Sequence, residues 1–261
     1  MARRLLLSIG ILPVLALVAA CGGAAPEPTS APPTQPPAPT APPAPEGYQG
    51  GEVTGGGTIT GTVSYAGPPV DPEVVTVDKD NQVCGDTIEL SSVQTDSTGG
   101  LANAVVRITE IASGKPLSTL GNRFVLDQHG CLYSPTVIIV PVGSALTVLN
   151  SDGILHNVHT TPFDNPPLNV AQPGTQAEIT SDEFTFPEVI PVDCDVHQWM
   201  HATIVAVDNP YAVVTAADGS FTLTDVPAGT YQVEVWHLEL GTQTFQVTVE
   251  AGGTTTQNAE Y

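Results

Sequence analysis

From residue 58 to the end of the chain, apolar and polar residues alternate with a period of two, as in ALTVLN (145–150) and TYQVEVWH (230–237). β-Branched residues dominate these segments, and Gly, Pro, Asn and Asp separate them. Side chains on a β-strand point to opposite faces in turn, so this pattern predicts half-buried strands and an all-β protein of antiparallel sandwiches. The other expected strands are 58–65, 102–111, 136–140, 189–194, 202–207, 220–224 and 243–250.

The N-terminus has the pattern of a bacterial secretory signal peptide over residues 1–20. Two arginines precede an apolar run that is too short for a membrane-spanning helix and contains a proline. The residues VAAC (18–21) resemble the lipobox, whose cysteine carries the lipid and becomes the first residue of the mature chain. The alternative is ordinary cleavage that leaves a stray thiol at Cys21. Lipidation predicts a lipid anchor in the cell membrane, facing the periplasm or the cell exterior.

Residues 21–57 are rich in Pro, Ala, Thr and Gly and form a predicted linker. Such a segment cannot bury enough apolar surface to offset the entropy of ordering, and its prolines favour extended polyproline II structure. At about 3.1 Å per extended residue, the linker is long enough to hold a folded body well away from a lipid surface.

The chain is strongly acidic, with 27 Asp and Glu residues against six Lys and Arg, and a formal charge of −21. Removal of the signal peptide also removes Arg3 and Arg4, so the mature chain keeps four basic residues and a charge of −23. This charge disfavours nucleic acid and anionic lipid headgroups as partners. It either serves solubility and tolerance of salt, or it steers a basic partner such as a small cytochrome.

Three cysteines remain when Cys21 is set aside, and an odd number cannot all pair within one chain. Either one thiol is free, or a metal binds it as a thiolate. Cys194 has histidines nearby in the sequence and is the candidate metal ligand. Cys84 and Cys131 would then form a disulfide around a loop of about fifty residues, which contributes on the order of 4 kcal/mol by the chain-entropy model.

The stretch CDVHQWMH (194–201) brings one cysteine, two histidines and a methionine within eight positions. These side chains are soft and borderline metal ligands. Upstream, LNSDGILHNVHT (149–160) follows an apolar strand and carries two further histidines. The two segments therefore offer donors to one metal ion. The alternative is a buried Cys and Met with hydrogen-bonded histidines in the core.

Together these segments resemble the copper-binding loops of the cupredoxins, the plastocyanin-like blue copper proteins. The resemblance covers about Arg123–Asp208 and includes PTVIIVPVGSALTV (135–148). It implies a Greek-key sandwich, here placed at 121–208, that binds one type 1-like copper ion. It also implies that Asn157 joins the two loops through hydrogen bonds. By this resemblance the copper ligands are His156, Cys194, His197 and Met200.

One departure from the family pattern concerns the axial ligand. Only Gln198 and Trp199 separate His197 from Met200, whereas plastocyanin-like loops usually have more residues there. A gap of two also occurs in the binuclear copper loop of oxidases, but that centre needs a second cysteine in the loop, which is missing here. A mononuclear site follows, with Met200, or alternatively His201, in the fourth position. Zinc is the alternative metal, although a methionine would be of little use to it.

The C-terminal segment TAADGSFTLTDVPAGTYQVEVWH (215–237) resembles the closing half of carboxypeptidase regulatory-like domains, which are small transthyretin-like sandwiches. GTITGTVSYAGPP (57–69) and LANAVVRITEI (101–111) resemble the opening half. The resemblance implies a second sandwich at 58–120 and 209–261, with the cupredoxin sandwich inserted in it or merged with it. The resemblance implies that this second sandwich serves as a support or spacer, or binds a partner.

The sequence contains no Ser-His-acid triad, no phosphate-binding loop and no framed pair of catalytic carboxylates, so an enzyme is not expected. The cupredoxin resemblance implies an electron carrier whose redox partner is a protein, such as a basic cytochrome. The signal peptide and the lipobox predict that this carrier is anchored to the membrane outside the cytoplasm. Two other functions remain open: a copper chaperone or resistance protein, and a cell-surface module whose metal is structural. A reversible copper couple distinguishes the carrier from both.

Overall fold

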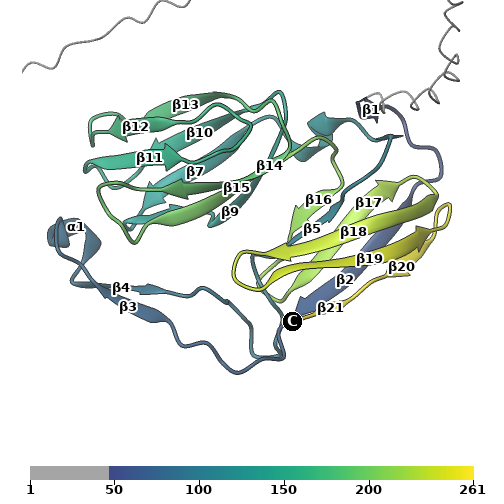
Figure 1. Ribbon diagram of the computed structural model, residues 1–261, viewed down its shortest axis with the longest axis horizontal. Helices are drawn as coiled ribbons and strands as arrows, with labels where there is room; N and C mark the ends of the chain where they lie inside the picture. Colours follow the sequence, from purple (N-terminus) through teal and green to yellow (C-terminus); the bar gives the residue numbers. More distant parts are fainter. Residues whose placement is uncertain (1–46) are drawn as a thin grey trace, which may run out of the picture. The chain divides into compact units, whose positions relative to one another are not determined.

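A computed structural model describes residues 47–261 of the protein (Figure 1). The predicted signal peptide (1–20), the predicted lipidation site Cys21 and the linker up to residue 46 lie outside the described residues. Among residues 47–261, none of the helices has the length and the apolar character that crossing a bilayer requires.

The described chain is all-β, with one α-helical turn and one turn of 3₁₀ helix. In chain order the elements are β1 (Gln49–Gly50), β2 (Gly57–Ser64), β3 (Glu73–Thr76), α1 (Asn81–Cys84), β4 (Thr87–Leu90), β5 (Val105–Ile108), β6 (Ser113–Gly114), η1 (Leu117–Leu120), β7 (Phe124–His129), β8 (Leu132–Ser134), β9 (Val137–Pro141), β10 (Ala145–Asn150), β11 (His156–Thr160), β12 (Asn169–Gln172), β13 (Glu178–Glu183), β14 (Glu188–Asp193), β15 (His201–Val207), β16 (Ala212–Val214), β17 (Ser220–Val226), β18 (Gly229–His237), β19 (Gly241–Val249), β20 (Thr254–Thr256) and β21 (Ala259–Glu260).

Strands β7 to β15 form the first sandwich, from two sheets of order β13-β10-β7-β8 and β12-β11-β14-β15-β9. Alternate side chains point into the core between the sheets: in β10, Leu146, Val148 and Asn150 are buried while their neighbours are partly exposed. Each sheet also contains a parallel pair, β7 with β10 and β9 with β15. The sheets are therefore mixed rather than purely antiparallel, because the chain crosses to the other sheet for β9 before it returns for β10.

The second sandwich combines segments from before and after the first one. Its sheets have the orders β16-β5-β18-β19 and β17-β2-β20, and β21 also pairs with β2 (Figure 1). Buried residues such as Ile59, Val106, Phe221 and Val235 form its core. A smaller buried cluster draws on both sandwiches and consists of Val105, Val137, Val205, Val207 and Ala212.

All nine strands expected from the sequence are present; β10 has the expected ends, and the other eight begin or end at different residues. The largest difference is at 102–111, where only Val105–Ile108 is a strand, because Asn103 adopts a left-handed φ of 61°. Residues 47–57, expected as the end of the linker, are attached to the fold. β1 pairs with β6, and the Tyr48 hydroxyl donates to the Lys115 carbonyl at 2.5 Å.

A hairpin of β3 and β4 leaves the second sandwich and packs against the first (Figure 1). The segment between the two strands contains α1, and Cys84 at the end of α1 forms a disulfide with Cys131, which lies between β7 and β8. The predicted Cys84–Cys131 pairing is thus confirmed. Val77, Cys84 and Ile88 are buried in the core of the first sandwich. The hairpin, expected as part of the second sandwich at 58–120, therefore completes the core of the first.

Candidate metal centre

Two strand ends bring the candidate ligands together. His156 is the first residue of β11, and the loop from Cys194 to Met200 connects β14 to β15. Because β11 pairs with β14, and β14 with β15, this loop lies beside the start of β11. Within the loop, Met200 N–H donates to the His197 carbonyl at 2.9 Å, and Cys194 N–H donates to the Met200 carbonyl at 3.3 Å. These backbone bonds close the loop into a turn and fix the direction of its side chains.

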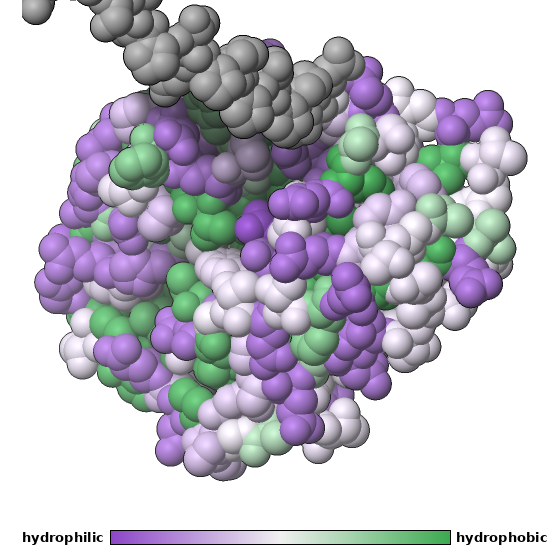
Figure 2. Space-filling model, turned by 45° about the vertical axis from the view of Figure 1, so that its right-hand side comes forward, coloured by the Kyte–Doolittle hydropathy of each residue, from purple (hydrophilic) through white to green (hydrophobic). Residues whose placement is uncertain are grey.

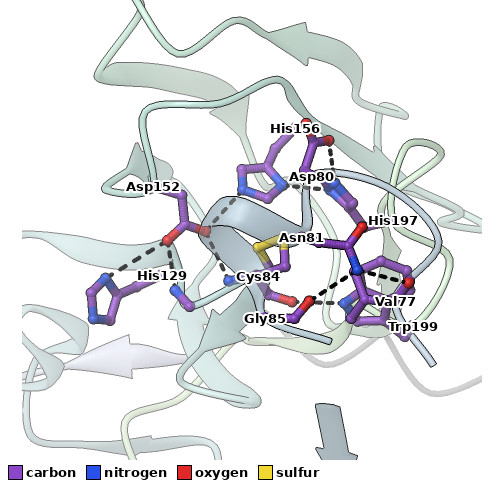
Figure 3. Close-up of a disulfide and its surroundings, with 12 residues drawn as sticks. Val77, Asp80, Asn81, Cys84, Gly85, His129, Asp152, His156, His197 and Trp199 are labelled. Carbon is purple, nitrogen blue, oxygen red and sulfur yellow. Dashed lines mark hydrogen bonds and ion pairs between the residues drawn. A yellow bond between two sulfur atoms is a disulfide. The ribbon is translucent and has the colours of Figure 1, made fainter. Parts of the chain in front are cut away.

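The imidazoles of His156 and His197 face each other, with their Nδ1 atoms 3.0 Å apart (Figure 3). The donor atoms of His156, Cys194 and His197 all lie within 4.8 Å of one another, and no residue of the three is more than 2% exposed. Two nitrogen donors about 2.0 Å from one ion in a tetrahedral set are roughly 3.3 Å apart. The observed separation is therefore close to that of two ligands on a shared ion.

The outer nitrogen of each imidazole is held by a carboxylate. His156 Nε2 lies 2.9 Å from Asp152 Oδ2, and His197 Nε2 lies 3.0 Å from Asp80 Oδ2. An ionised carboxylate only accepts, so a neutral imidazole in either position donates from Nε2 and has a lone pair on Nδ1. Burial also lowers the pKa of His156, which favours the neutral ring. Two lone pairs that face each other at 3.0 Å repel, so this arrangement favours a cation between them.

The Cys194 sulfur accepts two backbone hydrogen bonds. The backbone N–H groups of Asn157 and His197 each donate to Cys194 Sγ at 3.4 Å. Donors of this kind stabilise negative charge on sulfur. The Asn157 side chain also accepts from the N–H of Asp195 at 3.2 Å and donates to Asn169 Oδ1 at 2.9 Å. Asn157 therefore connects the two loops, as the resemblance implied.

Met200 and His201 differ in position. Met200 is fully buried in the same core cluster as Cys194. His201 is exposed at the start of β15, and its Nδ1 lies 2.6 Å from Asp193 Oδ1. Of the two candidates for the fourth position, only Met200 has its side chain in the interior. His159, the second histidine of the upstream segment, is partly exposed and is held at 3.0 Å by a surface carboxylate.

Asp80 is a site residue for which the sequence holds no recognisable signal. It precedes α1 with a left-handed backbone (φ 56°), a conformation that Asp adopts more readily than most residues. Its carbonyl accepts the N–H groups of Val83 and Cys84, so the helical turn begins there. Because Cys84 is bonded to Cys131, the disulfide holds Asp80 near His197, which is 117 residues away in the sequence.

We call residues 77–85 the cap, because this segment covers the outer edge of His197 (Figure 3). The Asn81 amide group donates to the Val77 carbonyl at 3.0 Å and to the Gly85 carbonyl at 3.3 Å, so the cap closes on itself. Through the Asp80 contact, the cap contributes to the complete burial of His197.

Trp199 packs against the same imidazole. The ring centroids of Trp199 and His197 are 5.2 Å apart, with the planes tilted by 46°. The indole Nε1 donates to the Cys131 carbonyl at 3.0 Å, which fixes the ring beside the disulfide. His197 is thus held by a carboxylate at its Nε2 atom and by an aromatic ring beside it.

The candidate donor set consists of two imidazole nitrogens and one sulfur, with a thioether side chain in the adjoining core. Imidazole, thiolate and a weak thioether suit copper, because both Cu(I) and Cu(II) accept such a set. Structural zinc sites usually take four strong donors, often with more thiolates. The residues fit a single copper ion better than a zinc ion.

Solved structures similar to parts of the chain include copper proteins. A purple cupredoxin from Nitrosopumilus maritimus is 19% identical over 32% of this chain and 99% of its own, with a TM-score of 0.28. A copper-containing nitrite reductase from Thermus scotoductus SA-01 is 16% identical over 56% of this chain and only 28% of its own, with a TM-score of 0.31. An oxidised mutant of amicyanin is 21% identical over 39% of this chain and 98% of its own, with a TM-score of 0.29. These scores are low, so we base the metal assignment on the donor geometry.

Sequence comparisons bear on the C-terminal part of the chain. No curated protein is significantly similar to the chain. A family model matches residues 199–260, which run from the end of the 194–200 loop, the metal loop, through β15 to the last strands. That segment is similar to the carboxypeptidase regulatory-like domain.

Proposed function

We propose that this chain is a mononuclear copper protein that carries electrons outside the cytoplasm and is held at the membrane by a lipid on Cys21. The facing Nδ1 atoms of His156 and His197, 3.0 Å apart and close to the Cys194 sulfur, carry this proposal. Copper bound there supplies a one-electron couple. The contribution of the chain is to hold the donors in one geometry that suits both oxidation states.

The surroundings of the ligands favour electron transfer over ligand exchange. Asp80 and Asp152 fix the two imidazoles, and Asn157 connects the loops that carry the ligands. A centre that is held in this way rearranges little when its charge changes, so electron exchange is fast. The proposed ligands are all buried, so a substrate in solvent does not reach them directly. The same features disfavour a copper chaperone, which must release its ion to an acceptor.

Copper titration of the full-length protein tests this proposal. We expect one Cu(II) ion per chain, intense visible absorption from thiolate-to-copper charge transfer, and a reversible one-electron couple in voltammetry. Zinc-loaded protein is the colourless control. A colourless copper complex would reject the thiolate site. Transfer of Cu(I) to an acceptor protein without a reversible couple would favour the chaperone instead.

Replacing Asp80 by asparagine should raise the reduction potential. An amide lacks the charge that strengthens the Nε2–H bond, so His197 becomes a weaker ligand, above all for Cu(II). Loss of such a carboxylate costs roughly 10–100-fold in metal affinity, and if Cu(II) bears all of that loss the potential rises by about 60–120 mV. Voltammetry of Asp80→Asn measures the shift. Asp78→Asn is the control, because it removes the same charge from an exposed residue of the cap. Equal shifts of the potential in the two variants would mean that overall charge, and not the hydrogen bond to His197, causes the effect.

Replacing Met200 by leucine should keep the copper and raise its potential by roughly 60 mV, a tenfold change in the preference for Cu(I). Leucine conserves the buried volume, so the fold should lose less than about 1.5 kcal/mol. The thioether stabilises Cu(II) more than an alkyl group does, and an oxygen donor does so more strongly. Met200→Gln should therefore lower the potential. Identical potentials in wild type and both variants would remove Met200 from the axial role.

A further inference from the structure

The proposed ligands do not reach the surface. His156, His197 and Met200 are 0% exposed and Cys194 is 2% exposed. Asp152 holds the outer edge of His156, and the cap holds that of His197. An electron that enters or leaves the site must therefore pass through a neighbouring side chain or through the cap.

Trp199 connects the site to the surface. Its ring packs on a proposed ligand, with the centroid 5.2 Å from that of His197 and the two planes tilted by 46°. Trp199 also lines a groove of about 450 Å³ that is open to solvent. A delocalised ring that contacts a ligand and borders a groove gives an electron a better path than saturated side chains do.

The groove lies between the β3–β4 hairpin and the metal loop. Its lining combines apolar and charged side chains from the two segments, among them Glu73, Val75, Asp78 and Leu90 from the hairpin side and Val196 and Trp199 from the loop. The Cys84–Cys131 disulfide joins the hairpin to the turn between β7 and β8, and the Trp199 indole of the metal loop donates to the Cys131 carbonyl in that turn. The groove is therefore a built feature of the fold.

Carboxylates outnumber lysines in the lining of this groove. Glu73 and Asp78 line it together with one lysine, Lys79. His201, which also lines it, is paired with Asp193. The whole chain has a formal charge of −21, and Figure 2 shows hydrophilic residues spread over one face of the molecule with small hydrophobic groups between them. A protein that docks in the groove should therefore present a positively charged face.

We propose that this groove is the docking surface for a redox partner protein with a basic and partly apolar face, and that electrons pass between partner and copper through Trp199 and His197. This inference rests on the proposed function. One electron moves in each encounter: Cu(I) is oxidised to Cu(II) while the cofactor of the partner is reduced by one electron, or the reverse, and no bond or proton is exchanged.

Electron exchange with tris(1,10-phenanthroline)cobalt(III), an aromatic trication, tests the docking surface. The full-length Cu(I) protein is compared with Glu73→Gln/Asp78→Asn and with the control Asp182→Asn/Glu183→Gln, which removes two exposed charges from β13. The groove variant should react about tenfold more slowly and the control less than about twofold, since attraction to a trication depends on nearby charge. Hexacyanoferrate(III), an anion, should react faster with the groove variant. Equal rates in the two variants would overturn the docking surface.

The redox-inert chromium(III) analogue of the same complex gives a second measurement, which does not depend on electron transfer. This paramagnetic cation should broaden the Trp199 indole N–H resonance of the Cu(I) protein, and Glu73→Gln/Asp78→Asn should remove the broadening. Broadening that is confined to other parts of the surface would overturn the inference.

Two substitutions of Trp199 test the path itself. Trp199→Phe and Trp199→Leu both lose the bond to the Cys131 carbonyl, but only phenylalanine keeps a ring beside His197. Exchange with the cobalt complex should be slower in the leucine variant than in the phenylalanine variant. Absorption and potential establish that the copper site is intact in each variant. Equal rates at an intact site would overturn the role of Trp199.

The outcomes separate this inference from the proposed function. A copper protein without a reversible couple would overturn both. A reversible couple with exchange rates that do not respond to the groove variant would overturn the docking surface alone and leave the electron carrier in place.

Discussion

Replacing Cys194 by serine should abolish the intense visible absorption that we expect from the Cu(II)-loaded protein. That absorption requires a thiolate sulfur on copper, and a serine hydroxyl is a hard donor that stays protonated at neutral pH. The variant should still fold, because serine is close to cysteine in size and its oxygen can accept the N–H groups of Asn157 and His197. Copper affinity should fall by more than the roughly 100-fold that is lost when a metal ligand loses its hydrogen-bond partner.

Absorption spectra and metal analysis after dialysis against a chelator measure both effects of Cys194→Ser. Cys21→Ser is the matched control, since it makes the same chemical change at the thiol that is predicted to carry the lipid. The control should keep the colour and the copper. If Cys194→Ser remained as coloured as wild type, the sulfur would not be a ligand, and the proposal of a copper carrier would fail with it.

The sequence pattern is sufficient to predict nine strands because each of them packs at least one face on a core, and β15 packs both. β13, with the sequence EITSDE, shows why others escape prediction. It lies at the edge of its sheet and none of its residues is fully buried, so its sequence carries no apolar alternation. Alternation also does not predict whether two strands pair in parallel or antiparallel, because it is the same in both kinds of pair.

β11, with the sequence HNVHT, escapes prediction for another reason. His156 and Asn157 occupy buried positions that an ordinary strand fills with apolar residues. Polar side chains stand there because the His156 imidazole faces that of His197, and the Asn157 amide bonds to the Asp195 N–H and to Asn169 Oδ1. Local rules for strands fail at such positions because the site imposes its own requirements.

The candidate ligands are predictable because they lie in two short segments with recognisable spacing, but Asp80 is not. Its contact with His197 spans 117 residues and depends on the path of a hairpin that leaves its own sandwich. Cysteine parity predicts the bond between Cys84 and Cys131. Parity does not reveal that Cys131 lies beside the metal loop, and only that position brings the cap to the site.

Replacing both Cys84 and Cys131 by serine should lower the free energy of unfolding by about 4 kcal/mol. The bond closes a loop with a sequence separation of 47 residues, and the chain-entropy model assigns a loop of that length this contribution. Urea denaturation of the metal-free, full-length protein measures the change. If the denaturation midpoint did not move, the packing of Val77 and Ile88 on the first sandwich would be sufficient to hold the hairpin.

The same double substitution should also accelerate copper loss. Without the disulfide, the cap is held only by packing and by the Asp80 carboxylate, so it opens more often and admits a chelator to His197. If the free energy of this local opening falls by about 1.4 kcal/mol, copper is lost tenfold faster. That is only part of the stability that the disulfide contributes. Asp80→Asn, with the disulfide intact, separates loss of the hydrogen bond from loss of the tether. If Asp80→Asn accelerated copper loss as much as the double substitution, the carboxylate and not the disulfide would be what keeps the site closed.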